Sequence, residues 1–347
     1  MIESKASRVY WIDALKGVGI IFVVLGHTLG IGAYVDKYIF SFHMPLFFFA
    51  SGFLIKNKDI ALSFKEFSFK YLRLLIIPYV FFGVVTYFPW LFFTRHFGEN
   101  ALIELNPIKP ILGILYGSGT DGWLYHNVML WFFPCLFMVH VMFRSIARAV
   151  GMHNIKIMVI PIAVIGYVLS IAGIPRMPWG VDIAITGLAF YMIGNLSRGI
   201  PERLNELKAF SVCMVLLAAL CVQVTAIHYN GRIDMNSLLY GNPILFYSGA
   251  LSGILFWAII CIRSQELRIL SKIGRNSIII FPLHRLSFSI ITWFGIYVFN
   301  MDVAFKQTLI ASLIYTSVSI FFLLLAAPLM RRYMPYFIGM KASNKST

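Results

Sequence analysis

The chain has 347 residues, of which 59% are hydrophobic and only 12% are charged, and its mean hydropathy is +0.81. Soluble chains carry about 25% charged residues, so this composition excludes a soluble globular protein. Apolar runs of about 20 residues recur along the sequence, which predicts an all-α, polytopic integral membrane protein in a lipid bilayer. The net charge is +15. Because the basic residues gather in alternate loops, we interpret them as an orientation signal and expect no nucleic-acid partner.

The cysteines give no sign of a metal site or a disulfide framework. All four fall inside apolar runs, and none has metal-ligand spacing. The sequence also lacks a His/Cys cluster, a glycine-rich phosphate loop and a nucleophile elbow. We therefore expect no bound metal and no bound cofactor. The cysteines are Cys135, Cys213, Cys221 and Cys261.

Ten membrane spans are predicted within one domain that covers residues 1–347. The first apolar run follows charged residues directly and lacks an Ala-x-Ala ending, so we do not expect a cleaved signal peptide. If both chain ends share one side, that side holds 22 Lys and Arg and the other holds 6, with Arg285 inside a span. This bias predicts that both ends are cytoplasmic. The approximate spans are 15–35, 38–56, 72–93, 123–143, 157–174, 180–197, 209–228, 244–262, 277–299 and 307–328.

The stretch DALKGVGIIFVVLGH, from Asp13 to His27, carries the first candidate site. Lys16 and His27 are eleven residues apart, almost three helical turns, so both lie on one stripe of a helix, roughly 16 Å apart along its axis. Asp13 lies close to the same stripe. Ionisable groups inside a membrane helix are costly and are candidates for function. The alternative is that His27 faces the bundle as a hydrogen-bonded structural residue.

The second span, YIFSFHMPLFFFASGFLI, places His43 about five residues from its outer end. Because the connection between the first two spans is short, we expect His27 and His43 at similar depth on neighbouring helices. Pro45 predicts a bend of the kind that commonly lines a cavity. An interfacial histidine bonded to a loop is the alternative for His43.

Basic residues are predicted at the cytoplasmic ends of several spans. Arg73 begins the third span, where a guanidinium can hold a phosphate through two hydrogen bonds. The ninth span opens KIGRNSIIIFPLHRL, with Arg275 at its mouth and His284 and Arg285 about two turns in. Together with Lys16, these arginines suit an anionic cytoplasmic molecule with a long arm, and a deeper histidine suits a general base. Arg285 has the alternative of snorkelling to the interface.

Five motifs follow one another in order: the charge and histidine of the first span, then SFHMPLFFFASGFL, RLLIIPY, LWFFPCLF and GRNSIIIFPLH. This set resembles the acyltransferase family 3 of bacterial integral membrane acyltransferases, and within it the branch related to fucose 4-O-acetylase. The resemblance covers about residues 8–330. It implies a ten-helix enzyme of the bacterial inner membrane that moves an acetyl group from cytoplasmic acetyl-CoA to a hydroxyl of a cell-envelope or exported glycan, such as O-antigen, capsule or exopolysaccharide.

The resemblance also assigns residues by position. His27 matches the family's essential first-span histidine, a base or transient acyl carrier, and Arg73 matches the family's arginine at the start of the third span. In the mechanism that we expect, His43 orients His27 or the sugar. Lys16 stands where many members have arginine. Lysine keeps the positive charge but lacks the planar guanidinium that binds phosphate through two hydrogen bonds. We expect no counterpart here to the hydrolase-like periplasmic domain of some relatives. The expected site is catalytic at His27 and His43, donor-binding at Lys16, Arg73, Arg275 and Arg285, and supported by Asp13 and His284.

Two other functional classes stay open. The first is a proton-coupled transporter of a glycan or small molecule, with His27, His43 and His284 as the proton relay. Many transporters contain inverted repeats, and the sequence shows none. The second is a structural or regulatory membrane subunit, for which substitution of the intramembrane histidines would have little effect.

Overall fold

The computed structural model describes residues 9–96, 106–264 and 267–340. In these ranges the regular structure is helical, and the β pairing consists of a single bridge between Asp234 and Leu239. The predicted all-α fold is confirmed. The α-helices are α1 (Tyr10–Gly26), α2 (Ala33–Leu54), α3 (Asn57–Ala61), α4 (Phe64–Tyr71), α5 (Ile77–Phe92), α6 (Ile108–Tyr116), α7 (Phe132–Val150), α8 (Ile155–Ile171), α9 (Val181–Leu196), α10 (Ile200–Glu206), α11 (Ala209–Tyr229), α12 (Pro243–Arg263), α13 (Arg268–Arg275), α14 (Ser277–Tyr297) and α15 (Leu309–Tyr333).

Eight helical segments of the described chain are long and apolar enough to cross a membrane. They correspond to the third to tenth predicted spans, and the protein therefore has the architecture of a multi-pass membrane protein. Several contain more than one element, because short 3₁₀ or π turns join them without a break. The segments are Phe64–His96, Tyr125–Val150, Met152–Ile171, Pro178–Glu206, Ala209–Tyr229, Pro243–Arg263, Ser277–Tyr297 and Leu309–Tyr333.

The first two predicted spans differ from the structure in their bounds. The first was expected over 15–35, but α1 begins at Tyr10 and ends at Gly26. Its 17 residues extend about 26 Å, less than the roughly 30 Å of a hydrocarbon core. A turn follows, in which the Gly30 backbone N–H donates to Ser312 Oγ on α15 at 3.0 Å. The apolar run thus contains a helix and a turn, which hydropathy alone does not separate.

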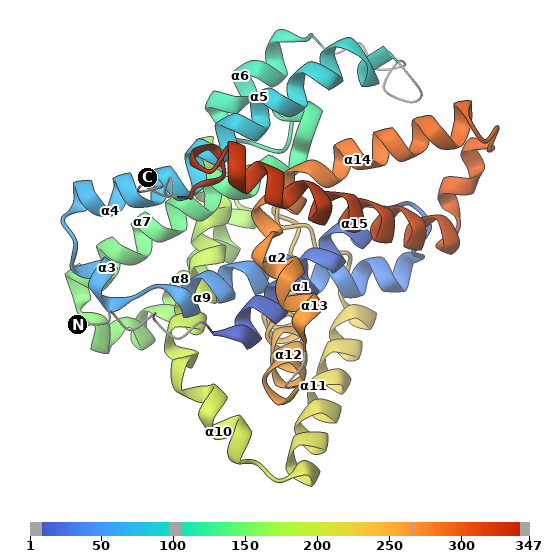
Figure 1. The fold of residues 1–347 in the computed structure, drawn as a ribbon. Helices are drawn as coiled ribbons and strands as arrows, with labels where there is room; N and C mark the ends of the chain where they lie inside the picture. The colour runs from blue at the N-terminus through green and yellow to red at the C-terminus, as the bar shows by residue number, and fades with distance from the viewer. Residues whose placement is uncertain (1–8, 97–105, 265–266, 341–347) are drawn as a thin grey trace, which may run out of the picture.

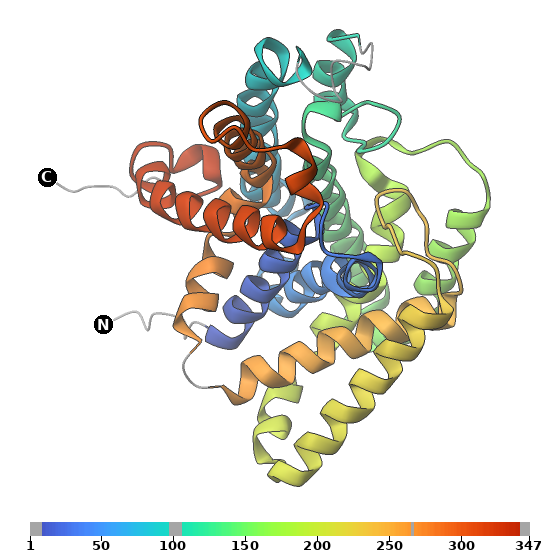
Figure 2. The same cartoon turned by 90° about the vertical axis from the view of Figure 1, so that its right-hand side faces the viewer.

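Both of these helices lie at the centre of the bundle (Figures 1 and 2). They run antiparallel, so that Trp11 near the start of α1 packs on Phe53 near the end of α2 with ring centroids 4.9 Å apart. Besides contacting each other, α1 packs against α12, α13, α14 and α15, and α2 packs against α9, α11 and α12. Because most of their surface faces protein, a polar residue on α1 or α2 can line an internal site without contacting lipid.

Two glycines allow α1 and α13 to approach each other closely. A Cβ on Gly17 would collide with the backbone carbonyl of Leu270, and a Cβ on Gly274 would collide with the carbonyl of Asp13. Small residues at a helix contact permit this kind of backbone approach in membrane proteins. The contact fixes the first half of α1 beside the turn that leads into α14.

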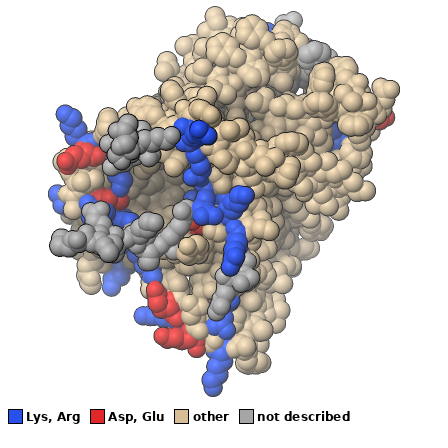
Figure 3. Space-filling model, in the orientation of Figure 1, with Lys and Arg blue, Asp and Glu red and all other residues tan. Residues whose placement is uncertain are grey.

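Lys and Arg side chains gather on one side of the molecule, around the beginning of α1 and the end of α15 (Figure 3). The outer parts of α14 and α15 show mainly uncharged residues in the same view. Both described ends of the chain therefore lie on the basic side. The positive-inside rule assigns that side to the cytoplasm.

Candidate active site

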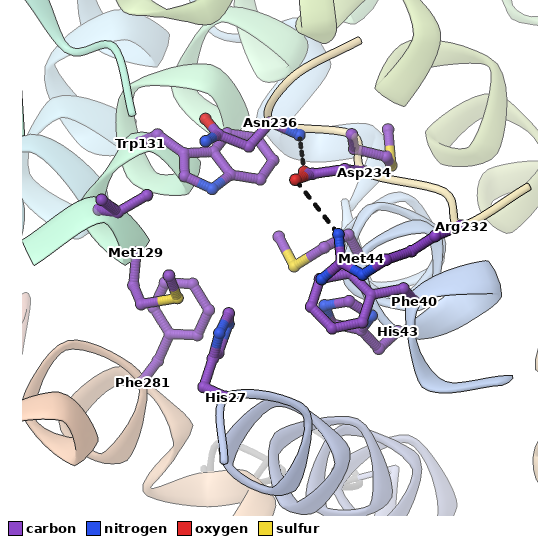
Figure 4. Close-up of a pocket in the computed structure, with 12 residues that line it drawn as sticks. His27, Phe40, His43, Met44, Met129, Trp131, Arg232, Asp234, Asn236 and Phe281 are labelled. Carbon is purple, nitrogen blue, oxygen red and sulfur yellow. Dashed lines mark hydrogen bonds and ion pairs between the residues drawn. The ribbon is translucent and has the colours of Figure 1, made fainter. Parts of the chain in front are cut away.

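A cavity of about 120 Å³ lies between the central helices and the loop 230–242, which joins α11 to α12. Figure 4 shows His27 pointing into it from α1 and Trp131 bordering it from the opposite side. The two histidines that the sequence predicted to be neighbours, His27 and His43, both line this cavity. Its lining comprises His27, Phe40, His43, Met44, Val128, Met129, Trp131, Arg232, Asp234, Met235, Asn236 and Phe281.

His27 caps the C-terminal end of α1 and is half-buried. Its ring stacks on that of His284 with centroids 5.5 Å apart and planes 24° apart. The edge of Phe40 contacts the same ring at 5.8 Å. Among the described residues, none forms a hydrogen bond with the imidazole of His27. Its orientation is thus set by packing, and its ring nitrogens are available to a reactant.

His43 is buried on α2, one helical turn after Ile39. The Nδ1 atom donates to the Ile39 carbonyl at 2.8 Å. A carbonyl only accepts hydrogen bonds, so Nδ1 carries the proton and Nε2 presents a lone pair. Phe40 makes edge contacts with both His43, at 4.8 Å, and His27, at 5.8 Å. The two imidazoles therefore share the cavity with an aromatic ring packed against both.

His284 is fully buried on α14 and forms the back of the site. Its Nδ1 donates to the Phe281 carbonyl at 2.7 Å, while its Nε2 has no hydrogen-bond partner among the described residues. The helix is fixed here by Asn127, whose Nδ2 donates to the Pro282 carbonyl at 2.7 Å. His284 thus presents a rigid ring to His27.

The predicted donor-binding residues lie at two depths. Asp13 is buried and Lys16 half-buried in the first half of α1, and Arg275 ends α13 beside them. Arg285 is eight residues into α14, about 12 Å along the helix axis, and is exposed directly after His284. It lies deeper than the other predicted cations, at the level of the histidines rather than at the cytoplasmic mouth.

Arg73 is placed at the mouth by a π-helical turn, Leu72–Ile76, a rare element that often marks functional positions. Its Nη2 donates to the Met340 carbonyl at 3.1 Å. Arg331 on α15, which the sequence did not single out, reaches the same corner. Its Nη2 donates to the Arg275 carbonyl and to Asn276 Oδ1, both at 2.9 Å. The contacts connect α13, α15 and the π turn at one end of the bundle.

The outer loop supplies further site residues that sequence reasoning missed. Arg232 is one of the six basic residues on the predicted outer side. Its Nε donates to Asp36 Oδ2 at 2.6 Å, and its guanidinium lies 3.7 Å from the centroid of the Phe40 ring. Asp234 Oδ1 accepts from the Asn236 backbone N–H at 3.0 Å (Figure 4). The polar run GRIDMNS between two apolar spans is the signal that could have identified them.

An ion pair between Arg176 and the buried Asp182 holds the loop 230–242 in place. Arg176 Nε donates to Asp182 Oδ2 at 2.6 Å, and its Nη1 donates to the Asn236 carbonyl at 2.5 Å. Asp182 is 0% exposed. Because a buried charge requires a partner, the pair holds two segments in fixed positions: the turn PRMPWG, residues 175–180, and the loop 230–242.

Comparison with known proteins identifies the family. A family model described as an acyltransferase domain matches residues 9–332. The chain belongs to the acyltransferase family 3. It is therefore a membrane acyltransferase, as the motifs predicted, whereas membership of the fucose 4-O-acetylase branch stays a prediction. No curated protein and no solved structure gives a match.

In a family 3 acyltransferase, this cavity is a candidate for the site of acyl transfer. A base must lie where both the acyl donor and the acceptor hydroxyl can reach it. His27 stands between the basic end of α1 on one side and the loop 230–242 on the other. The described residues contain no group of three His, Cys, Asp or Glu side chains that could hold a metal ion.

Proposed function

We propose that this protein is an O-acetyltransferase of the bacterial inner membrane, which moves acetyl from cytoplasmic acetyl-CoA to a hydroxyl of a cell-envelope or exported glycan. The observation that carries the proposal is the position of His27. It faces a cavity under the outer loop, and α1 connects it to a basic cytoplasmic mouth. A donor from one side and an acceptor from the other can thus meet at one imidazole.

The donor enters at the mouth. Arg73, Arg275 and Arg331 lie around the end of α15, and Lys16 lies on the adjoining part of α1. Guanidinium groups bind phosphate through charge-assisted hydrogen bonds. The pantetheine arm then extends along the roughly 16 Å between Lys16 and His27. This places the thioester carbonyl beside His27.

The transfer is a nucleophilic acyl substitution. A ring nitrogen of His27 takes the proton from the acceptor hydroxyl as the hydroxyl oxygen attacks the thioester carbonyl. The new C–O bond forms, the C–S bond breaks, and the CoA thiolate receives the proton from the imidazolium. In the covalent variant, a ring nitrogen of His27 first attacks the thioester carbonyl, so that a C–N bond forms and the CoA thiolate leaves. The acceptor oxygen then attacks this acyl group, the C–N bond breaks, and the hydroxyl proton passes to the CoA thiolate. Each route consumes one acetyl-CoA and releases one CoA.

The test uses purified protein in nanodiscs with acetyl-labelled CoA and cell-envelope glycan as acceptor. We expect label to leave CoA and to appear on the glycan as a base-labile ester, and transient label on the protein would identify the covalent route. Folded protein that binds no acetyl-CoA and moves no label would contradict the proposal. Counterflow of a labelled solute without acyl transfer would instead indicate a transporter.

A further inference from the structure

The loop 230–242 and the outer half of α2 bring a set of polar groups to the side of the cavity opposite the donor entrance. Two carboxylates, Asp36 and Asp234, flank the guanidinium of Arg232, with Nε to Asp36 Oδ2 at 2.6 Å and Nη1 to Asp234 Oδ2 at 3.5 Å. One cation between two carboxylates leaves this trio with a net charge of about −1. Asp234 and Arg232 are the only Lys, Arg, Asp or Glu side chains among the described residues that line the cavity.

The uncharged polar groups that line this space include hydrogen-bond acceptors beside the donors Trp131 Nε1 and Asn236 Nδ2. Asn236 Oδ1 is buried with no hydrogen-bond partner among the described residues. The Nδ1 of His43 is occupied by a carbonyl, which leaves Nε2 as an acceptor. The carboxylate of Asp234 also only accepts. A ligand that satisfies these atoms must donate hydrogen bonds, as hydroxyl groups do.

The remaining surface of the cavity is aromatic and apolar. Trp131 and Phe281 line one side, and Phe40, with Arg232 packed on its face at 3.7 Å, lines the other (Figure 4). The edges and faces of such rings suit the C–H surface of a sugar ring. At about 120 Å³ the cavity admits the reacting end of an acceptor, since sites that enclose a whole drug-sized ligand measure about 300–1,000 Å³.

We infer that this pocket binds the acceptor as a neutral sugar unit, a polyhydroxyl ring without a carboxylate, sulfate or phosphate group. The trio of Arg232, Asp36 and Asp234 repels an added negative charge, and the acceptor atoms of Asn236 and His43 favour hydroxyl donors. A uronic acid would place its carboxylate beside that of Asp234, and the charged donor of the lining, Arg232, already pairs with both Asp36 and Asp234. The inference rests on the proposed function and adds the class of acceptor to it.

Asp234 determines the charge of the pocket without taking part in proton transfer. Its Oδ1 accepts from the backbone N–H of Asn236, at 3.0 Å, and of Ser237, at 3.4 Å. Asp234→Asn keeps one oxygen for this turn but removes one negative charge. Asp302→Asn is the matched control. Asp302 is exposed, does not line the cavity, and accepts from the Ala304 N–H as an N-cap, a role that Asn fills equally well.

The experiment compares soluble acceptors in nanodiscs with acetyl-labelled CoA. The probes are methyl glycosides of glucose, galactose and mannose, each beside its methyl uronide. We expect kcat/KM for the neutral glycosides to exceed that for the uronides by at least ten-fold. Asp234→Asn should lower the ratio of kcat/KM for neutral glycosides to kcat/KM for uronides about ten-fold, whereas Asp302→Asn should leave this ratio unchanged. Asn236→Ala, a second variant, should raise KM for the neutral glycoside with little change in kcat.

Several results would overturn the inference while leaving the proposed function intact. The first is a preference of the wild-type protein for uronides. The second is a kcat/KM ratio of neutral glycosides to uronides that Asp234→Asn does not change. The third is label that leaves acetyl-CoA for water or cell-envelope glycan but reaches neither the neutral glycosides nor the uronides. Failure of the proposed function has a different signature, because the protein would then bind no acetyl-CoA and release no CoA with any acceptor.

Discussion

His27 and His284 come from opposite ends of the chain, yet their rings stack with centroids 5.5 Å apart. The hydrogen bond from His284 Nδ1 to the Phe281 carbonyl holds the supporting ring in place. Because no hydrogen bond from the described residues fixes His27, this stacking and the edge of Phe40 determine the plane of its imidazole. We therefore propose His284 as a positioning residue for the proposed base.

Replacement of His284 tests this positioning. His284→Ala removes the ring beneath His27 and should lower kcat about 10–100-fold, the cost of a misplaced catalytic group. KM for acetyl-CoA should stay close to the wild-type value, since Arg73 and Arg331 at the mouth lie away from His284. His284→Phe restores a flat ring and should recover part of kcat. Steady-state kinetics with labelled acetyl-CoA measures both constants, and an Ala variant with wild-type kcat would refute the role.

Arg73 should contribute to donor binding. Arg73→Gln removes the charge at the mouth and should raise KM for acetyl-CoA about ten-fold, because a charge-assisted hydrogen bond contributes roughly 1.5–3 kcal/mol. We expect a smaller effect on kcat. Arg332→Gln is the control, since Arg332 is an exposed neighbour of the mouth whose guanidinium lies over the Tyr333 ring. Equal KM changes in both variants would indicate a general loss of positive charge.

Sequence reasoning located the histidines better than the residues around them. From the short connection between the first two spans we expected His27 and His43 at similar depth on neighbouring helices. Both line the cavity, but His27 stands at the end of α1, whereas His43 is ten residues beyond the first residue of α2. His284 was placed only as a supporting residue, since the stack on His27 depends on how α14 packs against α1, a contact between distant parts of the chain.

The outer loop was missed for a related physical reason. Arg232 and Asp234 lie in a polar connection, where charge is expected at a membrane surface and carries no signal of its own. Their inward position follows from a backbone bridge between Asp234 and Leu239 and from the anchor at Arg176. Neither follows from hydropathy. The early end of α1 was likewise missed, because apolar residues continue after Gly26 at Leu29 and Ile31.

The contact between α1 and α13 should be sensitive to a single methyl group. In Gly17→Ala the new Cβ meets the backbone carbonyl of Leu270, which cannot rotate away. Overpacking of this kind costs about 1–3 kcal/mol. We expect a lower thermal midpoint in detergent. Gly199→Ala is the control, since no atom lies within 4 Å of its added Cβ, and equal midpoints for the two variants would contradict the packing.

The buried pair beneath the outer loop should stabilise both the fold and the site. Asp182→Asn preserves the shape of the side chain but leaves the guanidinium of Arg176 without its carboxylate, and breaking a buried pair costs about 3–5 kcal/mol. We expect a lower thermal midpoint and a higher KM for the acceptor, because Arg176 also holds the Asn236 carbonyl. Asp121→Asn, at an exposed position, should change neither value. A stable Asp182→Asn protein would show that the pair is dispensable.

The central claim is that His27 performs the acyl transfer. The most direct measurement is single-turnover transfer from acetyl-labelled CoA to glycan by His27→Ala, beside His228→Ala, which replaces an exposed histidine near the outer end of α11. We predict at least a 100-fold loss of transfer for His27→Ala, with acetyl-CoA binding and thermal midpoint retained, and no loss for His228→Ala. Transfer by folded His27→Ala at the wild-type rate would contradict the mechanism.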